Sequence, residues 1–366
     1  MKAHLLILLV ILFSACSHGN NNSDEEIIDE PELYFPSLST SDWETKSLES
    51  LNWDESKLES LYDFLQESDT RAFLVLKDGK IVIEKYWGNT ILNTGAFEQN
   101  SNWYWASAGK TLTSFLVGIA EQEGLLRIND KTSAYLGENW SDLSLEKENL
   151  ILIKHQLTMT TGLDYTVSTP DCTDKDCLKY KEDAGSQWFY HNAPYTLLEH
   201  VVSSAAGMTY NAFTDETIEA EIGMNGIWRA AGDNNVYWST ARDAARFGLL
   251  LLNKGAWEDK PAMLDEDYLN AMIHSSQNLN PSYGYLTWLN GKSSIVLPGL
   301  AASFNVPLSE DAPEDLFAAM GKNGQFIDVV PSKGIVVIRM GHAPDNSLVP
   351  SVFHNDMWTK LNAVIN

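Results

Sequence analysis

Residues 103–110 read Trp-Tyr-Trp-Ala-Ser-Ala-Gly-Lys and open a segment with helical periodicity. Apolar side chains recur after them with the i, i+3, i+4, i+7 spacing of one helix face, at Leu112, Phe115, Leu116 and Ile119. Gly124 follows at a position where it would end a helix. The pattern therefore predicts a helix that places Ser107 and Lys110 one turn apart on the same face.

A serine beside a lysine is an arrangement suited to nucleophilic catalysis. A serine hydroxyl is a poor nucleophile until a base takes its proton, and a lysine amine can do so once burial lowers its pKa. Apolar residues on both sides of Lys110 favour that burial. The motif alone is weak evidence, because Ser-x-x-Lys recurs at 144–147 in a charged stretch and Ser107 also suits a helix N-cap.

Further motifs follow in order along the chain. Residues 153–163 read Ile-Lys-His-Gln-Leu-Thr-Met-Thr-Thr-Gly-Leu, and residues 190–192 read Tyr-His-Asn just before a helical apolar face. Near the C-terminus, residues 321–326 read Gly-Lys-Asn-Gly-Gln-Phe. No Gly-x-Ser-x-Gly or His-Glu-x-x-His motif is present in the sequence, so two common alternatives for hydrolytic chemistry have no support.

This ordered set resembles the serine hydrolases of the beta-lactamase and penicillin-binding-protein superfamily, over roughly residues 50–345. Within it the chain is most similar to the class C branch, which contains family VIII carboxylesterases, D-aminopeptidase-like enzymes and 6-aminohexanoate-oligomer hydrolases. The resemblance implies that Ser107 is the acylated nucleophile and Lys110 its base. It implies that Tyr190 protonates the leaving group and activates water, and that Asn192 orients the substrate or the lysine.

The third motif of the family is altered in this chain. Penicillin-binding proteins and class C lactamases carry Lys-Thr-Gly where residues 319–322 read Ala-Met-Gly-Lys. The resemblance aligns Gly321 with the family's glycine, places Gly321 and Gly324 at substrate-binding positions, and implies an oxyanion hole made by the backbone N–H groups of Ser107 and Lys322. Loss of Lys-Thr removes a cation and a hydroxyl that recognise a carboxylate. We therefore expect an ester or small-amide substrate more than a beta-lactam.

Two groups of strands are predicted at opposite ends of the sequence. The first group, at 71–77 and 80–86, is joined through Asp78-Gly79, a strong hairpin signal. The second group has strands near 316–320, 325–330 and 335–340. The pattern and the resemblance both indicate an α+β, beta-lactamase-like fold, in which one antiparallel sheet is flanked by helices and accompanied by an inserted, mainly helical subdomain.

The length of the chain favours two subdomains. We expect an α/β subdomain made of residues 37–130 and 271–366, and a mainly helical subdomain of residues 131–270 that reads as helix and loop. Ser107 would lie at the floor of a cleft between them. Trp288 is the aromatic residue expected to line a hydrophobic acyl pocket there, and burial in the core is its alternative.

The N-terminus predicts export. An apolar run at 5–13 follows Lys2 and is too short to span a bilayer, so residues 1–15 are expected to be a signal peptide. The small residues before Cys16 resemble a bacterial lipoprotein cleavage site, which implies lipidation at Cys16; cleavage by an ordinary signal peptidase nearby is the alternative. Residues 16–36 would then be a tether, and the protein would be anchored in the periplasm or at the outer membrane of a bacterial cell envelope.

The remaining cysteines and the charge fit this location. In an oxidising compartment Cys172 and Cys177 would form a disulfide that closes a polar loop, whereas a metal clip lacks further ligands. The chain has 25 basic and 50 acidic residues and a formal net charge of −25, which argues against a nucleic-acid partner. Neither a metal site nor a cofactor is expected.

The sequence therefore predicts an exported serine hydrolase that cleaves an ester or small amide through an acyl-enzyme on Ser107. Two alternatives remain open at this point. One is a peptidoglycan-directed D-amino-acid peptidase or a weak beta-lactamase. The other is a catalytically silent member that serves as a ligand-binding or sensor lipoprotein, although a complete set of Ser107, Lys110 and Tyr190 argues against silence.

Overall fold

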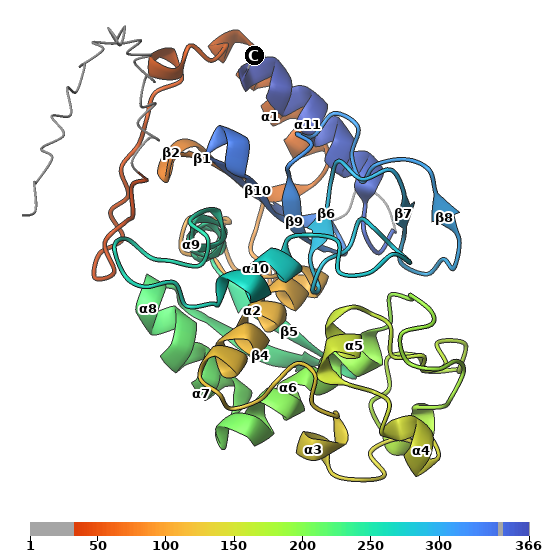
Figure 1. Cartoon of the computed structure of the whole chain (residues 1–366). Helices are drawn as coiled ribbons and strands as arrows, with labels where there is room; N and C mark the ends of the chain where they lie inside the picture. The colour runs from red at the N-terminus through yellow and green to blue at the C-terminus, as the bar shows by residue number, and fades with distance from the viewer. Residues whose placement is uncertain (1–32, 343–346, 366) are drawn as a thin grey trace, which may run out of the picture. The chain divides into compact units, whose positions relative to one another are not determined.

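A six-stranded antiparallel sheet forms the centre of the computed structural model, which describes residues 33–342 and 347–365 (Figure 1). The strand order is β2-β1-β11-β10-β9-β6. Their bounds are Thr70–Lys77 (β1), Lys80–Tyr86 (β2), Trp288–Leu289 (β6), Phe317–Gly321 (β9), Gln325–Val330 (β10) and Ile335–Gly341 (β11). Strands from both ends of the sequence are thus neighbours, as predicted.

Local sequence explains these strands. Every residue of β10 and β11 is buried, in keeping with their content of Val and Ile, which favour a pleated and enclosed backbone. Asp78 and Gly79, which join β1 to β2, have φ angles of 51° and 82°. Two successive left-handed residues give the turn that matches the twist of a hairpin.

Helices cover both faces of this sheet. On one face, Asp328 of β10 accepts hydrogen bonds from His354 and Trp358 of α11 (Ser351–Ile365). Because successive side chains of a strand point to opposite faces, Ile327 points to the other face, where Gly248 of α9 (Ala241–Leu252) packs closely against it. Helix α1 (Leu58–Glu67) lies alongside α11 (Figure 1).

The second part of the fold surrounds α2 (Gly109–Gln122), which is almost entirely buried. A three-stranded sheet in the order β3-β5-β4 lies beside it, with bounds Trp103–Tyr104 (β3), Gly226–Ala231 (β4) and Asn234–Ser239 (β5). The other helices are α3 (Ser133–Leu136), α4 (Leu145–Glu148), α5 (Ile153–Leu157), α6 (Asn192–Ala206), α7 (Tyr210–Thr214), α8 (Ala220–Ile222) and α10 (Glu266–Met272). Two short strands, β7 (Ile295–Val296) and β8 (Ser303–Phe304), pair with each other.

The hairpin of β4 and β5 differs from the expectation of helix and loop for residues 131–270. Most of β4 is exposed, and Trp228 is its buried residue, so the alternation that would indicate a strand is weak. The hairpin is stabilised by a distant partner, because β5 also pairs with β3. Helix α9 likewise comes from this range of the sequence but packs on the six-stranded sheet.

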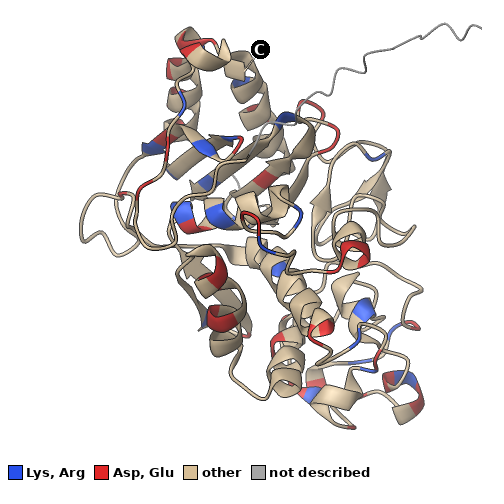
Figure 2. Ribbon diagram, turned by 60° about the vertical axis from the view of Figure 1, so that its left-hand side comes forward, with Lys and Arg blue, Asp and Glu red and all other residues tan. Residues whose placement is uncertain are grey.

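The described residues form one compact unit. The predicted signal peptide, Cys16 and most of the predicted tether lie outside the described residues. Within the described part of the chain, no helix is both long and apolar enough to cross a membrane. Acidic side chains occur on helices and loops throughout the unit, in keeping with the net charge (Figure 2).

Candidate active site

The backbone at Ser107 is a tight turn directly before α2. Ser107 lies in the 3-10 helix η3 (Ala106–Ala108), and the α-helix begins at Gly109, inside the motif, so that Lys110 lies in α2 and Ser107 just before it. Ala106 has a φ of 47°, a left-handed conformation that is unfavourable for alanine. Trp105 restrains this turn, because its backbone N–H donates to Tyr237 at 2.8 Å and its indole N–H donates to Ser239 at 2.9 Å.

Ser107 and Lys110 are in contact, as their spacing predicted. The Nζ atom of Lys110 and the Oγ atom of Ser107 are hydrogen-bonded at 3.0 Å. Lys110 is only 3% exposed. Burial lowers its pKa to about 7, and the nearby carboxylate of Asp171 opposes that shift. A large fraction of this amine is therefore neutral near pH 7 and able to accept a proton.

Two tyrosine rings enclose Lys110. Its Nζ atom lies 5.0 Å from the ring centre of Tyr190 and 4.1 Å from that of Tyr195, a residue of α6 that the sequence analysis did not identify. Burial raises the pKa of both phenols, and the Ser107 hydroxyl partly offsets the shift for Tyr190. The Tyr190 hydroxyl is buried and forms no hydrogen bond of ordinary geometry within the described residues, although the Ser107 hydroxyl lies near enough to influence its pKa. It is thus a protonated group beside the pair of Ser107 and Lys110.

Trp288 contacts Tyr190, the predicted general acid. It is 1% exposed, and its ring stacks on Tyr190 with 5.8 Å between the ring centres. Tyr283 and Trp188 pack edge-on against Trp288. This aromatic cluster orients the Tyr190 ring, while the role of Trp288 as a wall of the substrate pocket stays a prediction.

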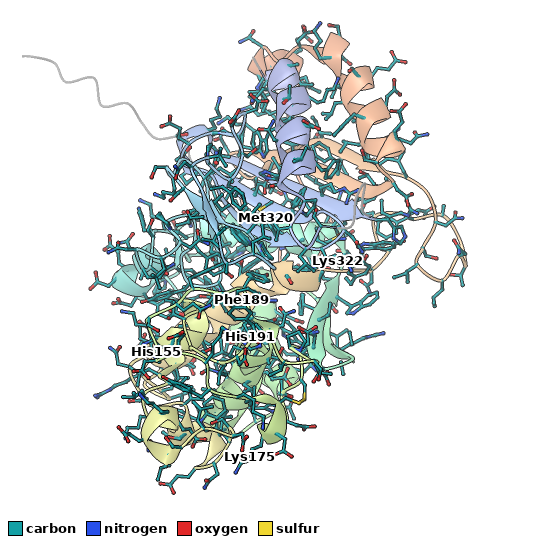
Figure 3. The ribbon with its side chains drawn as sticks, turned by 90° about the vertical axis from the view of Figure 1, so that its right-hand side faces the viewer. His155, Lys175, Phe189, His191, Met320 and Lys322 are labelled. Carbon is teal, nitrogen blue, oxygen red and sulfur yellow. A yellow bond between two sulfur atoms is a disulfide. The ribbon has the colours of Figure 1, made fainter. Side chains whose placement is uncertain are left out.

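The end of β9 lies against the turn that carries Ser107. A Cβ atom added to Gly321 would be 2.6 Å from the Trp105 carbonyl oxygen and 3.0 Å from the Ser107 nitrogen, so this position requires glycine. Lys322 follows directly (Figure 3). Its backbone N–H and that of Ser107 thus belong to two segments in direct contact, the arrangement that a two-donor oxyanion hole needs.

Gly324 has a different surrounding. It lies in the turn between β9 and β10 with a φ of 69°, and an added Cβ would be 2.7 Å from the guanidinium of Arg339. Its glycine is therefore explained by the turn and by the buried arginine. A contact of Gly324 with the substrate stays a prediction.

Asn192 and an acidic residue that the sequence analysis missed form a polar group beside Lys110. The amide of Asn192 donates to Asp171 at 2.9 Å, and the amide of Asn234 donates to the other carboxylate oxygen at 3.3 Å. Asp171 comes from the loop before Cys172, and Asn234 from β5. Because these partners are distant in sequence, only the fold brings them together.

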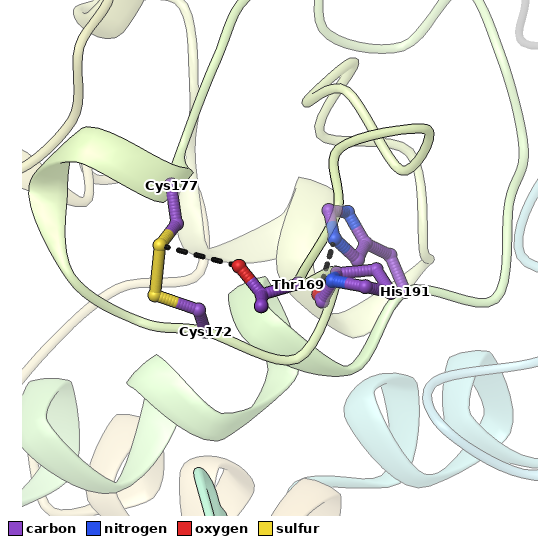
Figure 4. The surroundings of a disulfide bond; sticks show 5 residues. Thr169, Cys172, Cys177 and His191 are labelled. Atoms are coloured by element: carbon purple, nitrogen blue, oxygen red, sulfur yellow. Dashed lines mark hydrogen bonds between the residues drawn. A yellow bond between two sulfur atoms is a disulfide. The ribbon is translucent and has the colours of Figure 1, made fainter.

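The loop that carries Asp171 is held by a disulfide and a histidine (Figure 4). Cys172 and Cys177, the pair expected from the sequence, are joined by a disulfide. His191, next to Tyr190, is hydrogen-bonded through Nε2 to the Pro170 carbonyl oxygen at 2.8 Å. Phe189 and His191, on either side of Tyr190, are labelled in Figure 3, together with Met320 and Lys322 at the end of β9.

A separate cavity of about 850 Å³ lies beside α6 and the β4–β5 hairpin. It is lined by residues that include Glu199, His200 and Asn235, and none of the predicted catalytic residues lines it. Across residues 33–342 and 347–365, no group of three or more His, Cys, Asp and Glu side chains is placed to hold a metal ion.

Comparisons with known proteins identify the family to which the chain belongs. The family model described as Beta-lactamase matches residues 65–349. An uncharacterised protein of Alkalihalophilus pseudofirmus is 24% identical over 298 residues, which are 73% of this chain and 82% of that protein.

Solved structures share the fold. A candidate 6-aminohexanoate-dimer hydrolase from Bacillus anthracis is similar with a TM-score of 0.64 and 17% identity, covering 82% of this chain and 81% of that chain. A candidate beta-lactamase from Bacteroides dorei has a TM-score of 0.65 and 16% identity, covering 86% and 99%. An octameric penicillin-binding-protein homologue from Pyrococcus abyssi has a TM-score of 0.61 and 16% identity, covering 84% and 76%. The predicted α+β, beta-lactamase-like fold is confirmed.

Proposed function

Because the chain belongs to the beta-lactamase family, we propose that it is a serine hydrolase that cleaves an ester or small amide through an acyl-enzyme on Ser107. The observation that carries the proposal is the 3.0 Å contact between Ser107 Oγ and a buried Lys110 whose pKa is about 7. A module that only binds a ligand has no need of a buried amine, which is costly to enclose, beside a serine.

Acylation begins when the neutral amine of Lys110 takes the proton of the Ser107 hydroxyl. The Oγ atom then forms a bond to the carbonyl carbon of the substrate, and the backbone N–H groups of Ser107 and Lys322 stabilise the oxyanion. As the bond to the leaving group breaks, the phenol of Tyr190 gives that group its proton. The ammonium of Lys110 returns a proton to Tyr190, so both residues recover their starting states.

Deacylation reverses these proton transfers with water in place of the leaving group. Burial raises the pKa of Tyr190, so the phenol remains protonated and cannot serve as the resting base. We therefore assign the resting base to Lys110, with Tyr190 passing the proton from water to the lysine. Ser107 regains its proton when the acyl bond breaks, and the carboxylic acid product leaves.

An ester or small amide is favoured over a beta-lactam by the segment that edges the site. Ala319 and Met320 stand where Lys-Thr would recognise a substrate carboxylate, and both are buried strand residues. The hydroxyl and cation are thus replaced by apolar side chains that bind no anion. Weak beta-lactamase activity or D-amino-acid peptidase activity is the alternative that the turnover experiment must distinguish from ester hydrolysis.

We also propose that the protein is exported and anchored through lipid on Cys16. The Cys172–Cys177 disulfide supports an oxidising compartment, because such bonds are rare in the cytosol. Mass spectrometry of the N-terminal peptide from the mature protein tests this. A diacylglycerol-modified cysteine is expected, and an unmodified N-terminus elsewhere would refute the anchor.

The catalytic proposal is tested by intact-mass spectrometry after exposure to a fluorophosphonate, together with turnover of p-nitrophenyl butyrate, nitrocefin and a D-Ala-D-Ala peptide. A single adduct on Ser107 and preferential ester turnover are expected, and the Ser107→Ala variant should show neither. A folded wild-type protein without adduct or turnover would instead indicate a silent ligand-binding protein. Faster turnover of nitrocefin or of the peptide would refute the proposed substrate class.

A further inference from the structure

The turn between β9 and β10, residues 322–324, is bound through each of its backbone carbonyl groups by a buried side chain. Gln325 donates through Nε2 to the carbonyl oxygen atoms of Lys322 at 3.3 Å and Asn323 at 3.2 Å. Arg339 donates to those of Asn323 at 2.5 Å and Gly324 at 3.1 Å. A surface turn between two strands ordinarily leaves such carbonyls to water, so the orientation of this turn is unusually constrained.

Arg339 extends these contacts to two other segments. Its guanidinium donates to the Ser68 carbonyl at 2.8 Å and the Thr70 hydroxyl at 3.1 Å, before and at the start of β1. It also donates to the carbonyl of His342, just after β11, at 2.8 Å. The turn is thereby connected to the central strands β1 and β11 of the six-stranded sheet.

Burial of the charged Arg339 guanidinium among these contacts costs free energy. Arg339 is fully buried, and all of its described hydrogen bonds go to neutral oxygen atoms. Enclosing a guanidinium without a carboxylate partner carries a large desolvation penalty. Burial accordingly lowers the pKa of Arg339 to about 9. An apolar residue at this strand position would avoid that desolvation penalty, but it would leave the carbonyl groups of the turn without their donor.

The turn also contacts the segment that carries Ser107, through the side chain of Asn323. Asn323, whose φ is 68°, donates through its side-chain amide to the Tyr104 hydroxyl at 2.6 Å. Tyr104 lies in β3, three residues before Ser107. Together with the close approach of Gly321, this contact sets the separation between the backbone N–H groups of Ser107 and Lys322.

We propose that Arg339, assisted by Gln325, is a positioning residue for the oxyanion hole, because it fixes the turn whose first backbone N–H, at Lys322, stabilises the transition state. This inference rests on the proposed function. Arg339 contacts neither the substrate nor the reacting atoms, so its effect is on geometry. Since a displacement of about 1 Å at such a donor can cost about 100-fold in rate, loss of Arg339 should lower kcat by about 10- to 100-fold.

The molecule provides a matched control. Arg246 is also buried and donates to the backbone carbonyls of Pro36, Ser37 and Ile222, far along the chain from the β9–β10 turn. The variants Arg339→Met and Arg246→Met each remove a buried guanidinium that binds carbonyls, and both should lower Tm. Only Arg339→Met should lower kcat, with little change in KM.

The discriminating experiment measures Ki for a trifluoromethyl ketone, which forms an oxyanion on Ser107, and for its methyl ketone analogue, which mimics the ground state. Arg339→Met is expected to weaken the first inhibitor by about the loss in kcat and to leave the second unchanged. Arg246→Met should change neither. Equal effects of the two arginine variants on kcat and on the trifluoromethyl ketone would overturn the inference.

Two milder variants cover the case in which Arg339→Met does not fold. Arg339→Lys keeps a cation but loses the forked donor geometry, and Tyr104→Phe removes the acceptor of the Asn323 amide. Each should show a smaller loss of kcat and of trifluoromethyl ketone affinity, and wild-type values in both would refute the proposal. If the wild-type protein itself gives no turnover and no adduct on Ser107, the proposed function fails, and this inference fails with it.

Discussion

The ring of Tyr195 lies closer to the amine of Lys110 than the ring of Tyr190 does, at 4.1 Å against 5.0 Å. Tyr195 therefore contributes to the enclosure of this amine on the side of α6. A tyrosine ring attracts an ammonium through its face, but its apolar bulk also removes solvent, and the lowered pKa of Lys110 indicates that desolvation is the stronger effect.

Replacing Tyr195 by alanine should admit water to Lys110 and raise its pKa towards the ordinary value. The ascending limb of the kcat/KM profile against pH would then move to higher pH by about one unit or more. Tyr195→Phe keeps the ring and should leave the limb in place. A wild-type profile for the alanine variant would show that other side chains keep the amine dry.

Lys110 as the general base predicts a specific pH dependence. Activity requires the neutral amine, so kcat/KM should rise with pH through an apparent pKa of about 7. Lys110→Arg keeps a positive charge that cannot be lost in this range and should reduce kcat/KM by about 10²- to 10⁴-fold. Rates measured from pH 5 to 9 test both statements. Substantial activity in the arginine variant would exclude a proton-accepting lysine.

Lys110 should also reduce the stability of the protein. Its pKa is about 7 when folded and about 10.4 when unfolded, so between these values the unfolded chain binds more protons. The free energy of unfolding therefore rises as pH increases from 7 to 10, and below pH 7 the penalty is fully present. Lys110→Met, of similar length and uncharged, should be more stable than wild type at pH 7, with a smaller difference at pH 10. Thermal unfolding at both pH values provides the measurement.

Asp171 should tune the same base in the opposite direction. Its carboxylate raises the pKa of Lys110, so Asp171→Asn should lower that pKa and shift the ascending limb to lower pH. Asp176→Asn is a matched control, because Asp176 is exposed in the adjoining loop that the disulfide closes. If the two variants gave the same profile, the charge of Asp171 would have no specific effect on the lysine.

Gly321 is expected to be intolerant of even a methyl group. An added Cβ would meet the Trp105 carbonyl and push β9 away from the Ser107 turn, so Gly321→Ala should lower kcat by about 100-fold. Gly95→Ala is the control, since a Cβ there would meet no atom within 4 Å. Turnover and near-ultraviolet circular dichroism should be measured together, and normal turnover in Gly321→Ala would contradict the close contact.

Local signals in the sequence predicted the main sheet well. The turn residues Asp78 and Gly79, and the buried apolar runs of β10 and β11, mark strands whose pairing needs no other information about the chain. The β4–β5 hairpin was missed because its stability depends on β3, more than a hundred residues earlier. The pair Gly232-Asp233, which separates the two strands, was a local hairpin signal, and Gly232 has the positive φ that such a turn needs.

The candidate site likewise has contacts that the local sequence predicts and contacts that depend on distant parts of the chain. The spacing of Ser107 and Lys110 is local, so their contact followed from helix geometry alone. The burial that lowers the pKa of Lys110 comes from Tyr190 and Tyr195, and its electrostatic surroundings from Asp171. These contacts depend on how α6 and the disulfide loop pack, which no short pattern encodes. In the sequence, Arg339 looks like an ordinary strand residue. Its hydrogen-bond acceptors are mostly backbone carbonyl groups, which leave no pattern in the sequence.

The position of β11 between β1 and β10 has a consequence for the synthesis of this protein. The two strands that meet at Thr70 and Gly341 leave the ribosome on the order of tens of seconds apart at usual translation rates. Until β11 emerges, β1 can pair only with β2, its other neighbour in the sheet, and an isolated hairpin is marginally stable in water. A nonsense mutation before β11 would therefore remove the join between both ends of the chain and leave a nascent polypeptide that cannot complete its central sheet.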